Sequence, residues 1–264
     1  MTAAARGLCE RAVTRRRLIR GHCKEIGSRW RALPAGKIAG IVLAVLRCGQ
    51  RPGDLAGGNG IHRTTVTRWV REVVGLLAAR APHLDRDLKE IARKGGGVVL
   101  LDGSLIRTRR RTGTAKRKNY SGKHKHHGLL VIALTDDKSR LLWASAARPG
   151  RTSEITACRH DKLTHKLREA GLGAIADLGF LGLDTSGPDA DPAVITGCKA
   201  ARNRPPTRAQ KLSNKALAAV RAPVEHGFAH LKNWRVLDKV RTDPKWATAL
   251  VRALLVLTNR EVSR

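Results

Sequence analysis

Three segments of the chain carry apolar residues at the spacing of an amphipathic helix. They lie within residues 34–51, before the break at Pro52-Gly53, and within residues 62–77 and 244–255, and apolar positions recur there every three or four residues. Residues 78–97 are expected to form a more charged helix that ends in three consecutive glycines. The predicted buried faces are Ile38, Ile41, Val42, Val45 and Leu46; Val66, Trp69, Val70, Val73 and Leu77; and Ala247, Leu250, Val251, Leu254 and Leu255.

The second half of the chain has the rhythm of short strands. Apolar runs bounded by turn residues predict strands, and two longer segments predict helices between and after them. This order indicates an α/β fold in which helices flank a mixed sheet. The predicted strands are 98–101, 129–134, 140–146, 174–176 and 194–195; the predicted helices are 154–170 and 212–231, the second with the apolar stripe Leu217, Val220, Val224 and Leu231.

Charge changes the picture more than any other bulk property. The chain has 52 Lys and Arg against 21 Asp and Glu, a formal net charge of +31. Positive charge spread along the whole chain attracts phosphates through counterion release, so we expect a nucleic-acid partner. Aromatic residues make up only 3%, which disfavours a surface that stacks single-stranded bases.

Cysteine usage and hydropathy favour a cytoplasmic protein. The five cysteines are odd in number and form no CxxC pair, which is typical of reduced thiols. The longest apolar run near the N-terminus covers residues 38–46, too short to cross a bilayer. No membrane partner is expected.

Residues 52–77 have the pattern of a helix-turn-helix. A short first helix would be followed by a glycine-rich turn and a second helix that places Arg63, Thr64, Thr65, Thr67 and Arg68 outward toward DNA. The Gly57-Gly58-Asn59 segment lacks the helix formers of a usual first helix. A helical hairpin that only packs on the next domain is the alternative.

Three acidic residues occupy special places in this basic chain. Asp102 and Asp177 each follow directly on a predicted strand, and Glu225 lies one residue off the apolar stripe of the helix over 212–231. Neighbouring strand ends would bring the two aspartates together, and a helix packed on the sheet could add the glutamate. Carboxylates of this kind can hold two Mg²⁺ ions, about 3.5–4 Å apart, for phosphodiester cleavage.

Each acid also has a simpler interpretation. Asp102 with Gly103 could form an ordinary turn after a strand, and Asp177 could cap a helix. Glu225 could form an ion pair with Arg221 one turn earlier, although this order of charges is the weaker one.

The second half resembles the transposases of the insertion-sequence 5 group and the related Harbinger-type DDE superfamily endonucleases. The similarity covers about residues 55–255, and its last motif is the most specific. The motifs that carry it are Leu101-Asp102-Gly103-Ser104-Leu105-Ile106, the stretch from Asn119 to Gly128 with Tyr120-Ser121-Gly122-Lys123, Leu141-Leu142-Trp143-Ala144-Ser145 with Arg148-Pro149-Gly150, Asp177-Leu178-Gly179-Phe180-Leu181-Gly182, and Val224-Glu225 with Leu231-Lys232-Asn233-Trp234-Arg235.

The resemblance implies a ribonuclease-H-like core and a DNA transposase that cuts and joins phosphodiester bonds at element ends. Asp102, Asp177 and Glu225 would be the catalytic, metal-binding residues, with Mg²⁺ as cofactor and Mn²⁺ as a substitute. The substrates would be double-stranded DNA at terminal inverted repeats and target DNA. A homodimer is expected because two ends must be joined, in the bacterial cytoplasm near the nucleoid.

The resulting domain organisation has three parts. Residues 1–33 would be a basic arm or a solvated helix, residues 34–94 a helical DNA-binding domain, and residues 95–264 the ribonuclease-H-like catalytic domain.

The basic and histidine-rich run at residues 123–127 is a further candidate. No cysteine lies nearby, so a closed zinc site is disfavoured. Phosphate contact by Lys123, Lys125 and His127 fits both the charge and the resemblance, and Lys232 and Arg235 in the closing motif are added as DNA contacts.

The chain departs from the family pattern at three points. The family usually has His-Asp after the Pro-Gly pair, where this chain has Ser153-Glu154, and Phe180 replaces the usual tyrosine. The segment after Gly182 also carries unusual acids: Asp184, Asp189 and Asp191. These changes keep open a second function, a non-catalytic or repurposed DNA-binding protein derived from a transposase. A structural RNA-binding protein would leave the spacing of the acids a coincidence.

Overall fold

A computed structural model describes residues 17–25, 33–109, 114–136, 138–184, 193–200, 205–240 and 243–262. Of the predicted basic arm, residues 17–25 form a helix, and residues 1–16 and 26–32 lie outside the described residues. In the described part, no helix is long and apolar enough to cross a membrane.

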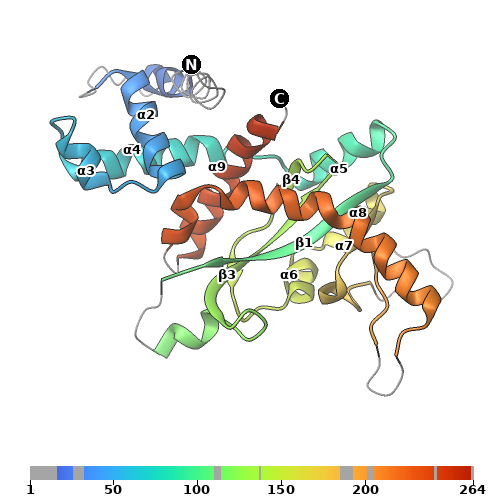
Figure 1. Cartoon of the computed structure of the whole chain (residues 1–264). Helices are drawn as coiled ribbons and strands as arrows, with labels where there is room; N and C mark the ends of the chain where they lie inside the picture. The colour runs from blue at the N-terminus through green and yellow to red at the C-terminus, as the bar shows by residue number, and fades with distance from the viewer. Residues whose placement is uncertain are drawn as a thin grey trace.

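A mixed sheet forms the centre of the molecule (Figure 1). Strand β1 (Val98–Arg107) pairs antiparallel with β3 (His126–Thr135) on one side and parallel with β6 (Gly173–Ala176) on the other. β7 (Val194–Thr196) extends the parallel side. Three short strands pair with β3: β2 (Tyr120–Ser121), β4 (Leu141–Ala144) and β5 (Arg148–Pro149). The predicted α/β sheet is confirmed, and its topology is consistent with a ribonuclease-H-like fold.

Strand β1 is longer than the sequence pattern predicts. The expected strand ends at residue 101, whereas β1 continues to Arg107 and pairs Asp102 with Ala133 of β3. The prediction that Asp102 ends a strand is therefore wrong. The polar residues after Leu101 looked like a turn, but hydrogen bonding to the long β3 keeps them extended. β6, by contrast, ends at Ala176, opposite Leu101.

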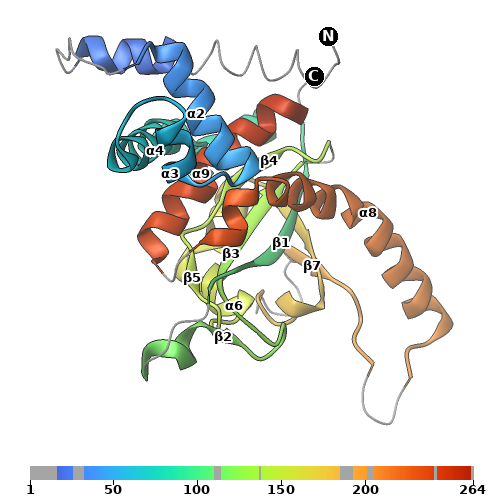
Figure 2. The same cartoon turned by 60° about the vertical axis from the view of Figure 1, so that its left-hand side comes forward.

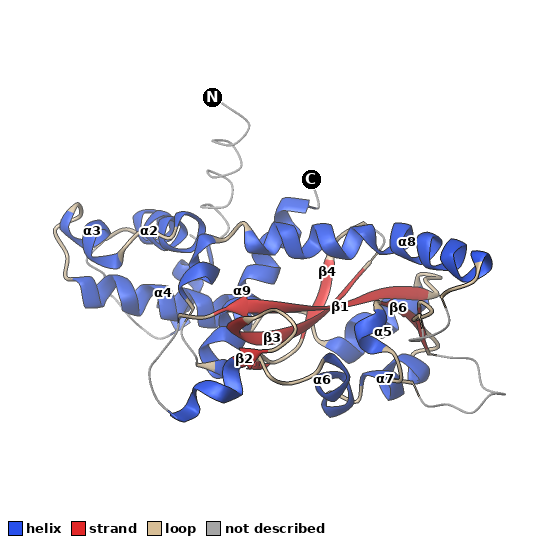
Figure 3. Ribbon diagram, turned by 60° about the horizontal axis from the view of Figure 1, so that its bottom comes forward, coloured by secondary structure: helices blue, strands red, loops and turns tan. Residues whose placement is uncertain are grey.

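Helices cover both faces of the sheet (Figure 3). α5 (Leu84–Arg93), α6 (Glu154–His160) and α7 (Leu163–Glu169) pack on the face that carries Val99, Leu101 and Ile132. α8 (Arg208–Lys232) and α9 (Pro244–Val262) pack on the face that carries Leu100. The single helix predicted over 154–170 is two helices, because the chain turns at Lys162 with a φ of 52°.

The N-terminal helices form one hydrophobic cluster with the end of the chain. α2 (Ala35–Cys48), α3 (Pro52–Gly57) and α4 (Arg63–Ala78) lie together, and α4 packs on α9 (Figure 2). All of the apolar positions predicted to be buried in α2, α4 and α9 are buried. This cluster continues onto the α8 face of the sheet.

Helix α8 is buried only in its C-terminal half. Val224 and Leu231 are buried as predicted, but Val220 of the same stripe is 50% exposed and Leu212 is 61% exposed. Figure 1 shows the reason, since the N-terminal half extends past the edge of the sheet. Of the predicted apolar stripe, Val224 and Leu231 are thus buried, Leu217 is half-buried and Val220 is exposed.

Candidate active site

Asp102 and Asp177 come together where β6 ends beside β1. Leu101 pairs with Ala176, so the next residue of each strand is one of the two aspartates. The chain leaves the sheet after Ala176, which gives β1 a free edge from Asp102 onward on that side. The two aspartates therefore lie next to each other as predicted, although Asp102 is inside its strand and not at the strand's end.

Backbone amides orient both aspartates. Asp102 Oδ1 accepts a hydrogen bond from its neighbour's amide, Gly103 N, at 2.8 Å. Asp177 Oδ1 accepts one from Gly179 N at 2.8 Å and caps the short helix η2 (Leu178–Phe180). Asp177 thus has the capping role of its simpler interpretation, while its Oδ2 faces Lys123.

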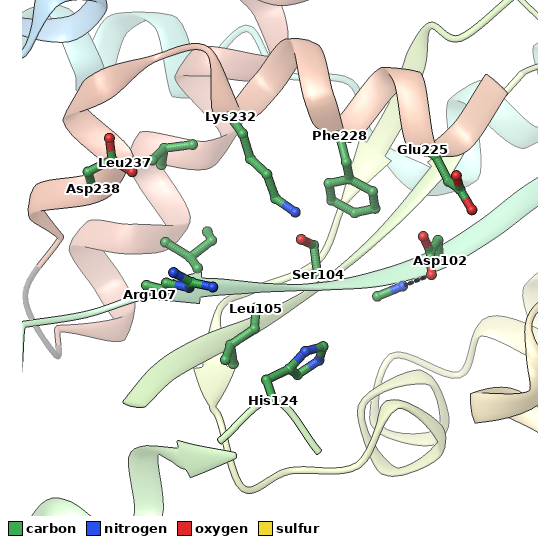
Figure 4. Close-up of a pocket in the computed structure, with 12 residues that line it drawn as sticks. Asp102, Ser104, Leu105, Arg107, His124, Glu225, Phe228, Lys232, Leu237 and Asp238 are labelled. Carbon is green, nitrogen blue, oxygen red and sulfur yellow. Dashed lines mark hydrogen bonds between the residues drawn. The ribbon is translucent and has the colours of Figure 1, made fainter. Parts of the chain in front are cut away.

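Glu225 reaches the same region from α8. It lines a cleft of about 500 Å³ together with Asp102, and the two carboxylates face each other across it (Figure 4). The helix comes this close because Gly227 lies against the turn and strand below it, where a Cβ would be 3.1 Å from Ser139 O. Buried Val224 and Phe228 fix the rotation of the helix.

Arg221 contacts Asp102 across the space between α8 and β1. Its Nη2 lies 3.7 Å from Asp102 Oδ1, and the two side chains are 15% and 18% exposed. The simpler interpretation of Glu225 had paired this arginine with Glu225 instead. Sequence reasoning missed its role at Asp102, although its position one helical turn before Glu225 was the available signal.

Glu154 is a carboxylate of this region that the predicted site did not include. It begins α6 and its side chain is only 8% exposed. Lys123 Nζ donates to both of its oxygens, Oε1 at 2.9 Å and Oε2 at 3.0 Å, and lies 4.0 Å from Asp177 Oδ2. The departure from the family pattern at Ser153-Glu154 was the sequence signal.

The surroundings of the site raise the pKa of both Asp102 and Lys123. Burial raises the pKa of Asp102 to about 6; the charges of Asp177 and Glu154 add to this, against the Gly103 amide and Arg221. Desolvation acts to lower the pKa of Lys123, but the Glu154 bond and the surrounding carboxylates outweigh it and raise the pKa. Both groups therefore hold their protons more tightly than they would in water.

The donor chemistry suits a hard divalent cation. Carboxylate oxygens are the ligands that Mg²⁺ prefers. Asp102 on β1, Asp177 after β6, Glu154 on α6 and Glu225 on α8 carry them in this region. Among the residues that the structure describes, no three His, Cys, Asp or Glu side chains are arranged to hold one ion together. Side-chain cations contact these carboxylates instead.

The predicted DNA contacts fall into two groups. Lys232 lines the cleft with Asp102, and Lys123 belongs to the acidic site. Nearby, Lys125 is exposed, His127 packs edge-on against Tyr120 at 5.2 Å, and Arg235 is exposed on η3 (Arg235–Lys239). The second group lies apart from the cleft on the first two turns of α4: Arg63, Thr64, Thr67 and Arg68 are exposed and Thr65 is half-buried.

Comparison with known proteins adds one finding. Residues 101–259 match the protein family described as DDE superfamily endonuclease. The matched segment contains all of the acidic residues described above. A search of curated proteins and a search of solved structures each found no match.

Proposed function

The chain belongs to the DDE superfamily of endonucleases, and from this premise we propose that it is a transposase of the insertion-sequence 5 group, related to Harbinger-type enzymes. The family is one of transposase-like nucleases that act on DNA. The proposed reaction is the cutting of phosphodiester bonds at element ends and their joining to target DNA.

One observation carries the proposal. Asp102 and Glu225 face each other across one cleft, and Asp177 follows the strand beside Asp102. These acids lie 75 and 48 residues apart in sequence and on separate elements, inside the segment that matches the family. A protein that only bound DNA would gain nothing from acids gathered beside its substrate, because they repel phosphates.

Endonucleases of this superfamily generally use divalent metal ions. Asp102, Asp177 and Glu225 are the proposed ligands of Mg²⁺, with Mn²⁺ as a substitute. When bound, the metal supplies an activated oxygen nucleophile and relieves charge on the leaving oxygen, in the proposed reaction with two ions. The Gly103 and Gly179 amides hold the aspartates in place, and Arg221 limits the negative charge at Asp102.

The cations along the cleft are proposed to hold the DNA backbone. Lys232 lies 5.9 Å above the Phe228 ring, in the cleft that contains Glu225. Lys123, Lys125, His127 and Arg235 would contact phosphates nearby. Such contacts position the duplex without reading its sequence.

Residues 34–94 are proposed to recognise element ends through a helix-turn-helix made of α3 and α4. Three facts support this: α3 begins at Pro52, a turn of five residues follows it, and the polar face of α4 is exposed at Arg63, Thr64, Thr67 and Arg68. Residues 95–264 would be the catalytic domain. Its last helix, α9, packs on α4, so the two proposed domains share a hydrophobic core.

The proposed assembly is a homodimer on double-stranded DNA, because two element ends must be joined to one target. The proposed location is the bacterial cytoplasm, at the nucleoid. The net charge of +31 supports a DNA partner at either step.

Strand joining tests this function. Purified protein, Mg²⁺ and duplexes that carry the ends of the encoding element are mixed with a supercoiled plasmid. Wild-type protein should yield end-cleaved duplexes and plasmids joined to them, and Asp102→Ala and Glu225→Ala should yield neither. Equal products from all of the proteins would show that these acids do not catalyse. Tight, end-specific binding without products would favour the repurposed DNA-binding protein.

A further inference from the structure

Two glycines make room for Glu154 between the two aspartates. At Gly103, directly after Asp102, a Cβ would lie 2.8 Å from Glu154 Cγ and 2.9 Å from Oε1. At Gly179, a Cβ would collide with Glu154 Oε2 and lie 2.9 Å from Asp177 Oδ1. Any other residue at either position would push Glu154 out, so the backbone around both aspartates is shaped to admit a further carboxylate.

The carboxylate that occupies this space already binds a cation. Both oxygens of Glu154 accept from Lys123 Nζ, at 2.9 and 3.0 Å, and the same nitrogen lies 4.0 Å from Asp177 Oδ2. The glutamate is 8% exposed, whereas the lysine side chain is 55% exposed. The fixed member of the pair is thus the carboxylate, and the ammonium group has an open path to solvent.

We propose that Glu154 is a fourth cation-binding carboxylate of the site, and that the Lys123 ammonium occupies its cation position until a divalent ion displaces it. This inference rests on the proposed function, since it concerns the same acids. It assigns to Glu154 a role at the position where the chain departs from the family pattern.

Charge balance supports an exchange of cations over a permanent ion pair. A carboxylate this deeply buried needs a positive partner, and leaving it unpaired would be costly. The single positive charge of the Lys123 ammonium faces two negative charges, those of Glu154 and Asp177. A divalent ion would bring two positive charges to the same pair. The half-exposed Lys123 can leave toward solvent, where DNA phosphates would be present.

Calcium binding to the full chain tests this inference without any cleavage step. Isothermal titration with Ca²⁺ would compare wild type with Lys123→Met, Glu154→Gln and the matched control Lys125→Met. The control removes the same charge two residues away, from an exposed side chain. We expect Lys123→Met to bind Ca²⁺ about tenfold more tightly, Glu154→Gln to bind it roughly 10–100-fold more weakly, and Lys125→Met to match wild type.

Thermal unfolding provides the second readout. Without metal, Lys123→Met leaves the Glu154 charge unpaired, so Ca²⁺ should raise its midpoint more than that of wild type. Wild-type Ca²⁺ affinity in Glu154→Gln would overturn the role of Glu154, and unchanged affinity in Lys123→Met would overturn the displacement.

These outcomes separate the inference from the proposed function. Mg²⁺-dependent DNA cutting combined with wild-type Ca²⁺ affinity in both variants would leave the function standing and remove the inference. Ca²⁺ binding that depends on Glu154 and Lys123, in a protein that cuts no DNA, would support the inference and overturn the proposed function. An absence of Ca²⁺ binding in every protein, Lys123→Met included, would overturn the inference together with the metal chemistry of the function.

Discussion

Gly103 and Gly179 are the residues on which the packing of the acidic site depends most closely. Neither has a positive φ, so their role is not conformational freedom but the absence of a side chain. Glu154 fills the space that a Cβ would need at both positions. The motifs that place a glycine near each aspartate therefore have a steric cause in this chain.

Gly179→Ala should disturb both stability and the site. The new methyl group would collide with the Glu154 carboxylate, and relief requires Glu154 or the backbone to move. We expect a loss of about 1–3 kcal/mol in the free energy of unfolding, measured by urea denaturation, together with slower DNA cutting. Gly97→Ala is the control, because a Cβ there meets nothing within 4 Å. Equal stability of the two variants would contradict the packing described.

The raised pKa of Asp102 predicts a stability that depends on pH. In the folded chain this pKa is about 6, above the ordinary aspartate value of 3.8, so folding favours the protonated acid. The contribution of the protonated Asp102 to the free energy of unfolding is fully present below pH 3.8 and is lost as the pH rises through 6.

Asp102→Asn mimics the protonated acid and keeps the acceptor for Gly103 N. In EDTA, urea unfolding should show the variant to be more stable than wild type by about 3 kcal/mol at pH 8, with the difference falling below about 1 kcal/mol near pH 4. A stability difference of the same size at both pH values would contradict the raised pKa of Asp102.

At the scale of elements, β1 and α8 show what periodicity can and cannot predict. The apolar spacing identified the helices and the strands, because each buries one face or one stripe. Strand length and helix coverage depend on what lies beside the element. Asp102 stays extended because β3 pairs with it, and Val220 is exposed because the sheet ends before it. No pattern inside either segment contains that information.

Helix α4 carries the proposed recognition surface, and Arg68 tests it. The residue is exposed on the second turn of α4. Arg68→Ala should weaken binding to an element-end duplex and lower the slope of log Kd against log salt by about one if it contacts a phosphate. The control is Arg80→Ala. Arg80 lies just past the C-terminal end of α4, and its guanidinium donates to Leu76 O. Fluorescence anisotropy measures both, and equal affinities would remove α4 from the interface.

Across the whole molecule, the sequence predicted the sheet, its flanking helices and the meeting of Asp102 with Asp177. Glu154 and Arg221 were missed because their roles arise from tertiary contacts. Glu154 reaches the site only because Gly103 and Gly179, both far from it in sequence, leave room for its side chain. Arg221 reaches the site because α8 passes over β1 at Asp102. The net charge of +31 predicted the polyanionic partner but not the acids that its chemistry requires.

The central claim is that Asp102, Asp177 and Glu225 act together in metal-dependent DNA cleavage. The most direct measurement is single-turnover cutting of an element-end duplex in Mg²⁺ by wild type and by Asp102→Asn, Asp177→Asn and Glu225→Gln, with DNA affinity measured in parallel. Each variant should bind DNA at least as tightly as wild type and cut it about 10³-fold more slowly or worse, with no cutting by any protein in EDTA. Cutting at the wild-type rate by any of these variants, or by wild type in EDTA, would contradict the claim.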